Sequence, residues 1–587
     1  MRTFLLTFLG GLAALVVFFV LIPLVLILSF VPSGEPAKAH NAVLEIDLRN
    51  SGPDQPAADA LNAVFSGDSF VETLLRLNAA VDDPDVKGVF VRAAESGLGS
   101  SRAEELRQAF LRLKAKGKFI IAHSQGFLAS GPAVYRAISA ADEIWIQPGT
   151  SFETPGITFE TMFLGGALEK LKVDPEIEQF YEYKNAADVY KQKGYTPAHA
   201  RAMTELAASV WGHSIADIAA DRKTDPATMR ALLEASPYPA EEAVKLKLVD
   251  RLGYPEEAAA AAEKRAGGEL LAINEYHPGH RGGRAVIAVV GGEGDIITGK
   301  GGPSGFLSLG TPVFASDRIA GEMLDLAKDK SIDAVVFRID SGGGSATASD
   351  QIWAAVKKLR ESGKKVVVSM GSMAASGGYY VAAGADEIIS TRSTITGSIG
   401  VFGGKFAIAD ALRQFGVNPQ EVRVGGEFAS AYSSDKFTPA QRAKLLEGLQ
   451  GVYDRFTGLV AEGRKLPLQK VQEIARGRVW SGEDGLKNGL VDKNGDLIFA
   501  LEEASRLAGF KPEDGMDIRM TIHRASPFEL LTSTMLQAKI AGVPESRIAE
   551  AAGSIVGRER AKVLIGQLRQ MSQQSGAQLW SPSVVER

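Results

Sequence analysis

Apolar residues along the chain form short continuous runs that alternate with stretches of helical spacing. In the C-terminal half, residues 317–330 and 348–363 show the 3.6-residue spacing of amphipathic helices. Residues 334–340 and 364–370 are apolar runs of the length of buried strands. Strands that alternate with helices form largely parallel sheets with right-handed crossovers. The pattern therefore predicts an α/β domain.

The same order of elements occurs a second time, in the N-terminal half. Four pairs of segments match in the same order at offsets between 242 and 246 residues, and Arg92 falls opposite Arg338. A constant offset over several matches is the mark of an internal repeat. We therefore expect two tandem α/β domains that arose by duplication. The pairs are 41–48 with 284–291, 85–100 with 331–346, 117–126 with 363–372, and 238–253 with 480–495.

These matches set the expected domain boundaries. The first repeat is placed at 40–275 and the second at 283–515, with a glycine-rich linker near 266–284. Residues 516–587 fall outside the duplication. They contain amphipathic stretches such as 545–568, and we expect a C-terminal tail of packing helices.

The N-terminus is the most apolar part of the chain. Residues 3–30 carry no charge, and about 20 apolar residues are enough for a helix to cross a bilayer. A cleaved signal peptide is the alternative, because 37–39 read Ala-Lys-Ala, but signal peptides have apolar regions of about 7–15 residues. Arg2 favours a cytoplasmic N-terminus. We expect one transmembrane anchor at 1–31, in the inner membrane, with the rest of the chain on the periplasmic side.

Composition excludes several classes of function. The 587 residues have a formal net charge of −5 and no long basic stripe, which argues against nucleic acid as a partner. The chain has no cysteine, so disulfides, cysteine-ligated zinc and thiol catalysis are excluded.

Ser376 is the first candidate for chemistry. It lies in "GSMAASGGYY" (371–380), directly after an apolar strand and among small residues that leave its hydroxyl accessible to another backbone. Serine and glycine are also ordinary turn residues, so this stretch alone fits a strand-to-helix turn equally well. A nucleophile needs an oxyanion site and a base elsewhere in the chain.

A glycine-rich turn after the preceding strand is the candidate oxyanion site. The strand 334–340 runs into "SGGGS", where Gly343 and Gly344 expose backbone N–H groups without a Cβ. Such groups can hold an anion, although a simple glycine turn before a helix is the alternative. No lysine follows at the spacing of a phosphate-binding loop. Together with Gly377 on the next strand, this turn can place two donors around one point.

The candidate base is a lysine. Six of the seven histidines precede the second repeat and the seventh is His523, so no histidine is available within the Ser376 domain. A buried lysine can serve as the base when its pKa is lowered. Lys184 aligns with Ala429 of the second repeat, while Pro132 of the first stands opposite Ser376. Each repeat then supplies one member of a dyad, although a surface lysine is the alternative interpretation of Lys184.

Four segments resemble the signal peptide peptidase A family (protease IV) in its long duplicated form, and more distantly the Clp peptidase and crotonase fold. The resemblance covers both repeats and the anchor. It departs from the family at Gly342, where the family has proline, and this change loosens the turn. The segments are "YKNAADVY" (183–190), "DSGGGSATASD" (340–350), "GSMAASGGYYVAAGAD" (371–386) and "TRSTITGSIGVFGG" (391–404).

The resemblance implies the site and the function. Ser376 is then the nucleophile, Lys184 the general base, and Ser398 the residue that orients the lysine. The oxyanion hole is formed by Gly377 with the Gly343/Gly344 turn. The implied activity is a serine endopeptidase that degrades cleaved signal peptides and other apolar peptides, with no cofactor and no metal, as a homotetramer.

Two other classes of function stay open on the residues alone. A membrane-tethered scaffold can bind apolar peptides without cutting them. A crotonase-like acyl-CoA enzyme can use the same N–H donors on a thioester, but the chain shows no basic patch for CoA.

Overall fold

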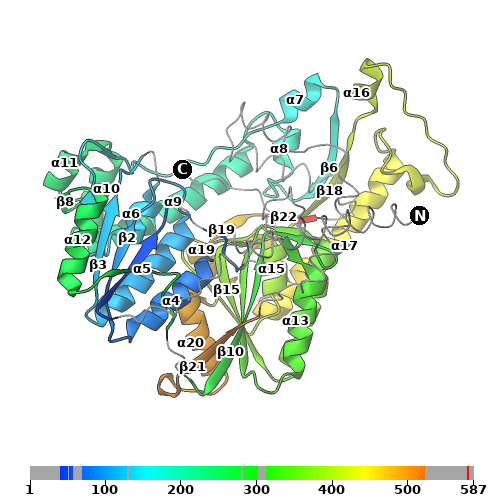
Figure 1. The fold of residues 1–587 in the computed structure, drawn as a ribbon. Coiled ribbons are helices and arrows are strands. Elements are labelled where there is room, and N and C mark those ends of the chain that lie inside the picture. The colour runs from blue at the N-terminus through cyan, green and yellow to red at the C-terminus, as the bar shows by residue number, and fades with distance from the viewer. Residues whose placement is uncertain are drawn as a thin grey trace, which may run out of the picture.

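The computed structural model describes residues 40–49, 52–56, 69–128, 131–278, 282–301, 313–521 and 578–580 (Figure 1). The predicted anchor at 1–31 and most of the predicted tail lie outside these residues. In the described part of the chain, every helix is too short or too polar to cross a bilayer.

A parallel sheet of six strands forms the centre of the first repeat. Two of its central strands, β2 and β3, are almost entirely buried, which fits their continuous apolar sequences. From edge to edge the sheet consists of β8 (Arg251–Leu252), β4 (Glu143–Ile146), β3 (Phe119–Ser124), β2 (Val86–Arg92), β1 (Ala42–Asp47) and β9 (Leu270–Ala272).

The second repeat contains a sheet with the same strand order. The strand order of the two sheets confirms the predicted duplication of α/β units. The six corresponding strands are β20 (Lys493–Asn494), β16 (Glu387–Ser390), β15 (Lys365–Ala375), β13 (Ala334–Ser341), β10 (Ala285–Glu293) and β21 (Met516–Met520). The end of β15 also pairs with β17 (Ile395–Gly397), which pairs in turn with β19 (Val479–Ser481).

The helices follow the same duplication. The long helices α9 and α17 both begin at a proline that follows a threonine cap, Thr196 and Thr438, whose side chains accept a backbone N–H. The first repeat has α4 (Phe70–Val81), α5 (Ser100–Ala115), α6 (Pro132–Ile138), α9 (Pro197–Asp221), α10 (Pro226–Glu234), α11 (Ala240–Lys245) and α12 (Pro255–Ala266). The second has α13 (Ser316–Lys328), α14 (Ala346–Glu361), α15 (Gly377–Ala382), α17 (Pro439–Arg464), α18 (Leu468–Ile474), α19 (Gly482–Asn488) and α20 (Leu497–Leu507).

The predicted end of the second repeat is wrong, and the predicted linker is too long. The expected linker at 266–284 contains β9, which pairs with β1, and the expected helical tail begins with strand β21, which pairs with β10. Both strands cover an otherwise open sheet edge, and an edge strand is retained because it satisfies the backbone groups of its neighbour. Both are too short and too weakly patterned to be recognised from sequence. The second repeat therefore extends to Thr521, whose N–H donates to Val289 O at 3.0 Å.

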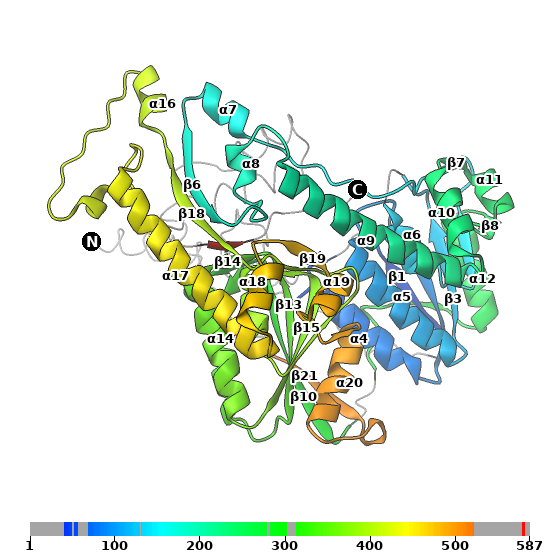
Figure 2. The same ribbon diagram turned by 180° about the vertical axis from the view of Figure 1, so that it is seen from behind.

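A third sheet joins the two repeats. Its order is β12 (Val313–Ala315), β11 (Asp295–Ile297), β14 (Gly343–Ser345), β22 (Gln578–Trp580), β18 (Val401–Ala407) and β6 (Asp174–Phe180). Strand β6 belongs to the first repeat, yet it pairs antiparallel with β18 of the second along its whole length. The two strands lie side by side in both views (Figures 1 and 2). Because of this pairing, the residues that follow β6 lie against the second repeat.

Smaller elements complete the chain. The segment after β18, which contains α16 (Ala409–Gln414), extends away from the two main sheets (Figure 2). The remaining elements are β5 (Ser151–Phe152), β7 (Tyr238–Pro239), α7 (Gly165–Lys170), α8 (Asp188–Lys191), η2 (Glu427–Ser430) and η3 (Pro512–Asp514).

One of the large hydrophobic clusters spans the two repeats. Helix α20 of the second repeat contacts α4 of the first, and the buried side chains of both belong to the same cluster. Arg338 of β13 is fully buried at this interface and pairs with Asp54 and Glu105 of the first repeat at 2.8 Å each. The repeats therefore form a single body, which fixes the distance between residues that each of them supplies.

Candidate active site

Ser376 occupies the turn between β15 and α15. Its backbone has φ 54° and ψ −116°, a conformation that residues with a Cβ rarely adopt and that marks functional turns. The turn is held from both sides, because the Ser376 N–H donates to Gly397 O at 2.8 Å and its carbonyl accepts from Tyr380 N. The side chain is fully buried. The β15–α15 turn therefore holds the Ser376 hydroxyl in one place.

Lys184 lies in the loop between β6 and α8 and points at this hydroxyl. Its Nζ lies 2.6 Å from Ser376 Oγ, 3.0 Å from Ser398 Oγ and 2.9 Å from Ser398 O. The structure thus brings together the three side chains that the sequence singled out, within one chain. The pairing of β6 with β18 makes this possible, since the lysine and the serine are separated by 192 residues.

The environment of Lys184 favours its neutral form. The side chain is completely buried, and this burial lowers the pKa of the amine well below its ordinary value of 10.5. A neutral amine has two N–H groups and one lone pair. With the two N–H groups donated to Ser398 O and Ser398 Oγ, the lone pair faces the Ser376 hydroxyl.

Ser398 follows β17 in a left-handed conformation with φ 51°. Its N–H donates to Arg478 O at 2.7 Å, so its backbone is fixed by a segment far along the chain. This conformation presents both the carbonyl and the hydroxyl of Ser398 to Lys184.

The glycine turn after β13 lies against the start of α15. A Cβ on Gly378 would lie 2.6 Å from Ser341 O, so the two turns are in direct contact. Gly343 and Gly344 have φ values of 107° and 154°, and a Cβ on Gly344 would lie 2.2 Å from Ile296 O. The Gly343 N–H donates to Ser341 Oγ at 3.1 Å, a contact that the sequence did not reveal. Both turns predicted to supply oxyanion donors are therefore adjacent.

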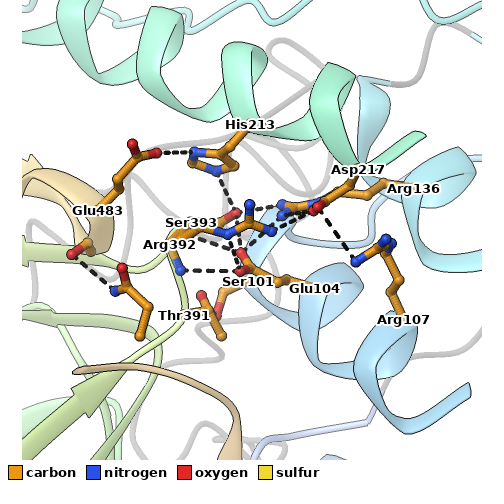
Figure 3. Close-up of polar contacts among 12 residues, drawn as sticks. Ser101, Glu104, Arg107, Arg136, His213, Asp217, Thr391, Arg392, Ser393 and Glu483 are labelled. Carbon is orange, nitrogen blue, oxygen red and sulfur yellow. Dashed lines mark hydrogen bonds and ion pairs between the residues drawn. The ribbon is translucent and has the colours of Figure 1, made fainter. Parts of the chain in front are cut away.

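A buried polar network fixes the loop that leads to Ser398 (Figure 3). Glu104 of the first repeat accepts hydrogen bonds from the Arg392 side chain at 2.8 Å and from Ser393 Oγ at 2.9 Å. Arg136 and Asp217, also of the first repeat, contact Ser393 and Arg392 respectively. Nearby guanidinium groups overcome burial and lower the pKa of Glu104 to about 2. Side chains of the first repeat thus hold Arg392 and Ser393, which precede Ser398 in the chain.

Two buried histidines, His123 and His213, make contacts away from Ser376. His213 Nε2 lies 2.9 Å from Ser393 Oγ and its Nδ1 lies 3.1 Å from Glu483, within the network of Figure 3. His123 contacts Gly253 O at 3.0 Å, and His523 lies outside the described residues. Over the described ranges, no group of three or more His, Asp or Glu side chains is arranged to hold a metal ion.

The chain resembles known proteases in sequence over both repeats. The model of peptidase family S49 matches residues 112–269 and 358–511, once in each repeat. A chloroplastic serine protease SPPA of Arabidopsis thaliana is 28% identical over 80% of this chain and 69% of its own. A protease 4 of Salmonella typhi is 29% identical over 76% of this chain and 72% of its own. A protease 4 of Haemophilus influenzae is 29% identical over 75% and 73%.

A solved structure also matches part of the chain. A ClpP1 variant from Listeria monocytogenes is 16% identical, with a TM-score of 0.24, over 36% of this chain and 94% of its own.

Proposed function

The chain belongs to peptidase family S49 and is a serine protease, and we propose that Ser376 is its nucleophile and Lys184 its general base. The observation that carries the proposal is the 2.6 Å contact between Lys184 Nζ and Ser376 Oγ in a fully buried setting. A base must lie within hydrogen-bonding distance of the proton that it removes. Among the groups that the structure describes around Ser376 Oγ, the Lys184 amine meets this condition.

The first half of the reaction forms an acyl-enzyme. The neutral amine of Lys184 takes the proton of the Ser376 hydroxyl as Oγ attacks the peptide carbonyl. The carbonyl and hydroxyl oxygens of Ser398 accept hydrogen bonds from the two N–H groups of the amine, which keeps its lone pair directed at Ser376 Oγ. The ammonium of Lys184 then gives its proton to the leaving amine, and the peptide bond breaks.

The second half releases the acyl group. Water loses a proton to the again neutral Lys184 as it attacks the acyl-enzyme carbonyl. The tetrahedral intermediate collapses, Ser376 Oγ leaves as a hydroxyl with the proton of Lys184, and the carboxylic acid product departs and gives its own proton to water. Protons and electrons balance without any group beyond this chain and water.

Backbone N–H groups are proposed to stabilise the oxyanion. Gly377 supplies one donor because it follows the nucleophile directly. The Gly343/Gly344 turn supplies the other, and its contact with the start of α15 supports this assignment. The Gly343 N–H already donates to Ser341 Oγ at 3.1 Å, so an oxyanion would replace that contact or use the Gly344 N–H. Gly342 in place of the family proline leaves these donors intact.

The backbone around the site supports an extended peptide as substrate. A segment of this chain, β22, lies antiparallel to β14, with Gly343 opposite Trp580 and Gly344 opposite Leu579. On its other side β22 pairs with β18 at Phe402. The edges of β14 and β18 therefore accept an extended strand next to the proposed oxyanion turn. A peptide bound in this way would present its carbonyls along the turn.

We further propose the substrate class and the setting. The 28 uncharged residues at 3–30 support a membrane anchor, which would place the site near cleaved signal peptides and other apolar peptides on the periplasmic side of the inner membrane. Assembly as a homotetramer belongs to the same proposal. Comparing hydrolysis of an apolar peptide with that of a charged peptide of equal length tests the substrate class. Membrane fractionation with and without residues 1–31 tests the anchor.

A non-catalytic scaffold and an acyl-CoA enzyme are less consistent with these findings. The matched relatives are named as proteases, and a scaffold has no use for a buried neutral lysine beside a serine in a left-handed turn.

Covalent labelling with a fluorophosphonate probe tests the dyad. We expect wild-type protein to be labelled at Ser376, and Ser376→Ala and Lys184→Met to lose both labelling and peptide hydrolysis while keeping the fold. Lys191→Met, in the helix that follows the Lys184 loop, is the matched control and should keep both. Full hydrolysis by Lys184→Met would disprove the assignment of the base.

A further inference from the structure

Residues Arg476, Gly477 and Arg478 form a short connection between α18 and β19, which we call the 476–478 segment. It belongs to the second repeat, but it lies between the loop that carries Lys184 and the loop that carries Ser398. Neither the sequence motifs nor the proposed mechanism gives this segment a role.

Backbone hydrogen bonds tie the segment to both loops. On the lysine side, Tyr183 N donates to Arg476 O at 3.3 Å. On the serine side, Gly477 N donates to Ile399 O at 2.8 Å, and Ser398 N donates to Arg478 O at 2.7 Å. The segment thus connects the residue before Lys184 with Ser398 and the residue after it.

Gly477 lies directly against the backbone of Lys184. A Cβ on Gly477 would lie 2.5 Å from Lys184 N and 2.6 Å from both Cα and Cβ of Lys184. Its φ of 81° is also in the region that favours glycine. Real Cβ atoms do not approach backbone this closely, so any side chain at 477 must push the lysine away from its place.

The two arginines contact the residues that precede Lys184. The Arg476 guanidinium lies 5.4 Å from the Tyr181 ring centre and pairs with Glu182 at 2.9 Å. The Arg478 guanidinium lies 5.3 Å from the Tyr183 ring centre, and it also pairs with Glu205 of α9. Arginine stacks well on aromatic rings and keeps its charge when partly buried. Three successive residues before Lys184 are therefore held by side chains of the segment.

The other repeat has a different sequence at the matching place. At the offset of 242 that aligns 480 with 238, the segment corresponds to Glu234, Ala235 and Ser236. The repeat whose segment lacks glycine and arginine there also lacks the serine nucleophile. The 476–478 segment and Ser376 thus both occur in the second repeat and have different residues opposite them in the first.

We propose that the 476–478 segment is a positioning element for the general base, with Gly477 setting the distance between the Lys184 backbone and Ser398. The inference rests on the proposed function, because positioning matters only if Lys184 is the base. The segment touches neither the substrate nor the reacting atoms. It acts by holding the Lys184 amine within reach of Ser376 and away from water.

Gly477→Ala is the direct test. Displacement of the base is expected to lower kcat about tenfold to a hundredfold, with KM nearly unchanged, because a shift of about 1 Å is enough for such a loss. Water that reaches the displaced amine raises its pKa, so the acid limb of the kcat–pH profile should move to higher pH by about one unit. A stability defect alone would not move this limb.

Gly117→Ala is the matched control. Gly117 has φ 78° and open space around its Cα, so alanine there introduces the same backbone strain without the contact. We expect Gly117→Ala to lose stability but keep kcat and the pH profile of the wild type. Equal kcat and equal profiles for both variants would overturn the proposal. The labelling of Lys184→Met, measured in parallel, reports on the dyad separately, so a failure of either idea is recognised.

Arg476→Ala and Arg476→Lys test the positioning role of the segment if Gly477→Ala does not fold. The pair with Glu182 is half-exposed and contributes little to stability, so both variants should fold. The expected result is a lower kcat and a shifted acid limb for Arg476→Ala, partly restored in Arg476→Lys. Wild-type kcat and pH profile in Arg476→Ala would then overturn the proposal.

Discussion

At the scale of single residues, the proposed general base Lys184 predicts how activity depends on pH. A protonated amine cannot accept the Ser376 proton, so activity should fall as pH drops through the pKa of Lys184. Burial sets this pKa well below 10.5, and kcat/KM should reach its plateau well below that pH. A steady-state pH profile with an uncharged peptide checks this, and activity that still climbs towards pH 10.5 would contradict it.

The same group links stability to pH. The unfolded chain binds a proton at this lysine below 10.5, whereas the folded chain keeps it neutral down to a lower pKa. The unfolded state therefore holds more protons between the two values, and stability rises with pH in that interval. Lys184→Met should lack this increase when urea unfolding of the two proteins is compared across pH.

Ser398→Ala should impair the base without removing it. The substitution deletes the hydroxyl that lies 3.0 Å from Lys184 Nζ but leaves the carbonyl at 2.9 Å. We expect kcat to fall about tenfold, since the lone pair is then less firmly directed. Ser214→Ala is a suitable control, because the buried Ser214 hydroxyl has no hydrogen-bond partner in the described part of the chain. Steady-state kinetics of both variants measures the difference.

At the scale of elements, the loop between β16 and β17 depends on the other repeat. Arg392→Met removes the pairs with Glu104 at 2.8 Å and Asp217 at 2.6 Å and leaves these carboxylates buried. Both carboxylates keep their pairs with Arg136, so we expect the free energy of unfolding to fall by less than the about 3–5 kcal/mol that a fully unpaired buried charge costs. Because β17 holds the Ser376 N–H through Gly397 O, kcat should fall as well.

An exposed arginine provides the comparison for this loop. Arg413 also has two carboxylate partners, Asp410 and Asp435, but all three side chains are about half exposed. Arg413→Met should leave urea unfolding nearly unchanged, because exposed ion pairs contribute little to stability. An equal loss in Arg413→Met and Arg392→Met would show that burial is not the cause.

At the scale of the whole molecule, Glu293 connects the two repeats and senses pH. Its carboxylate accepts the N–H groups of Asp54 and Gln55 at 3.0 and 2.9 Å. Burial, with Asp54 and Asp340 nearby, raises the pKa of Glu293 from 4.5 to about 7. The folded state therefore holds the extra proton, so this contribution to stability is complete below pH 4.5 and is lost as pH rises towards 7.

Glu293→Gln removes this titration. Between pH 4.5 and 8, the stability of wild type relative to the variant should fall by at most about 3 kcal/mol. Urea unfolding of both proteins across this interval measures the difference. Parallel curves for the two proteins would refute the prediction.

The strand β22 occupies the place that we assign to the substrate. Deletion of residues 578–587 frees the facing edges of β14 and β18. We expect a lower KM for peptide substrates with kcat unchanged, because a competing strand of the same chain is removed. An unchanged KM would mean that substrate does not bind at these edges.

The sequence by itself determined the local elements, the duplication and the identity of the dyad candidates. Helical and strand spacing depends on neighbouring residues, and both α13 and β13 lie within one or two residues of the predicted ranges. Ser376 is predicted from its local stretch, Lys184 from the comparison of the two repeats, and their roles from the family resemblance. The same comparison contained the signal for Gly477, whose counterpart is Ala235, but only its contact with the Lys184 backbone gives that difference a meaning.

Only the tertiary structure decided how these parts meet. The pairing of β6 with β18 across the repeats brings Lys184 to Ser376 over 192 residues, and no local pattern specifies a pairing between distant strands. Strand β9 lies within the predicted linker and β21 within the predicted tail, because the role of an edge strand depends on which edge it covers. The hydrogen bond from Gly343 N–H to Ser341 Oγ likewise depends on packing, because the surroundings of a turn fix its conformation. The sequence thus supplies the side chains of the proposed dyad, and long-range packing sets the distance between them.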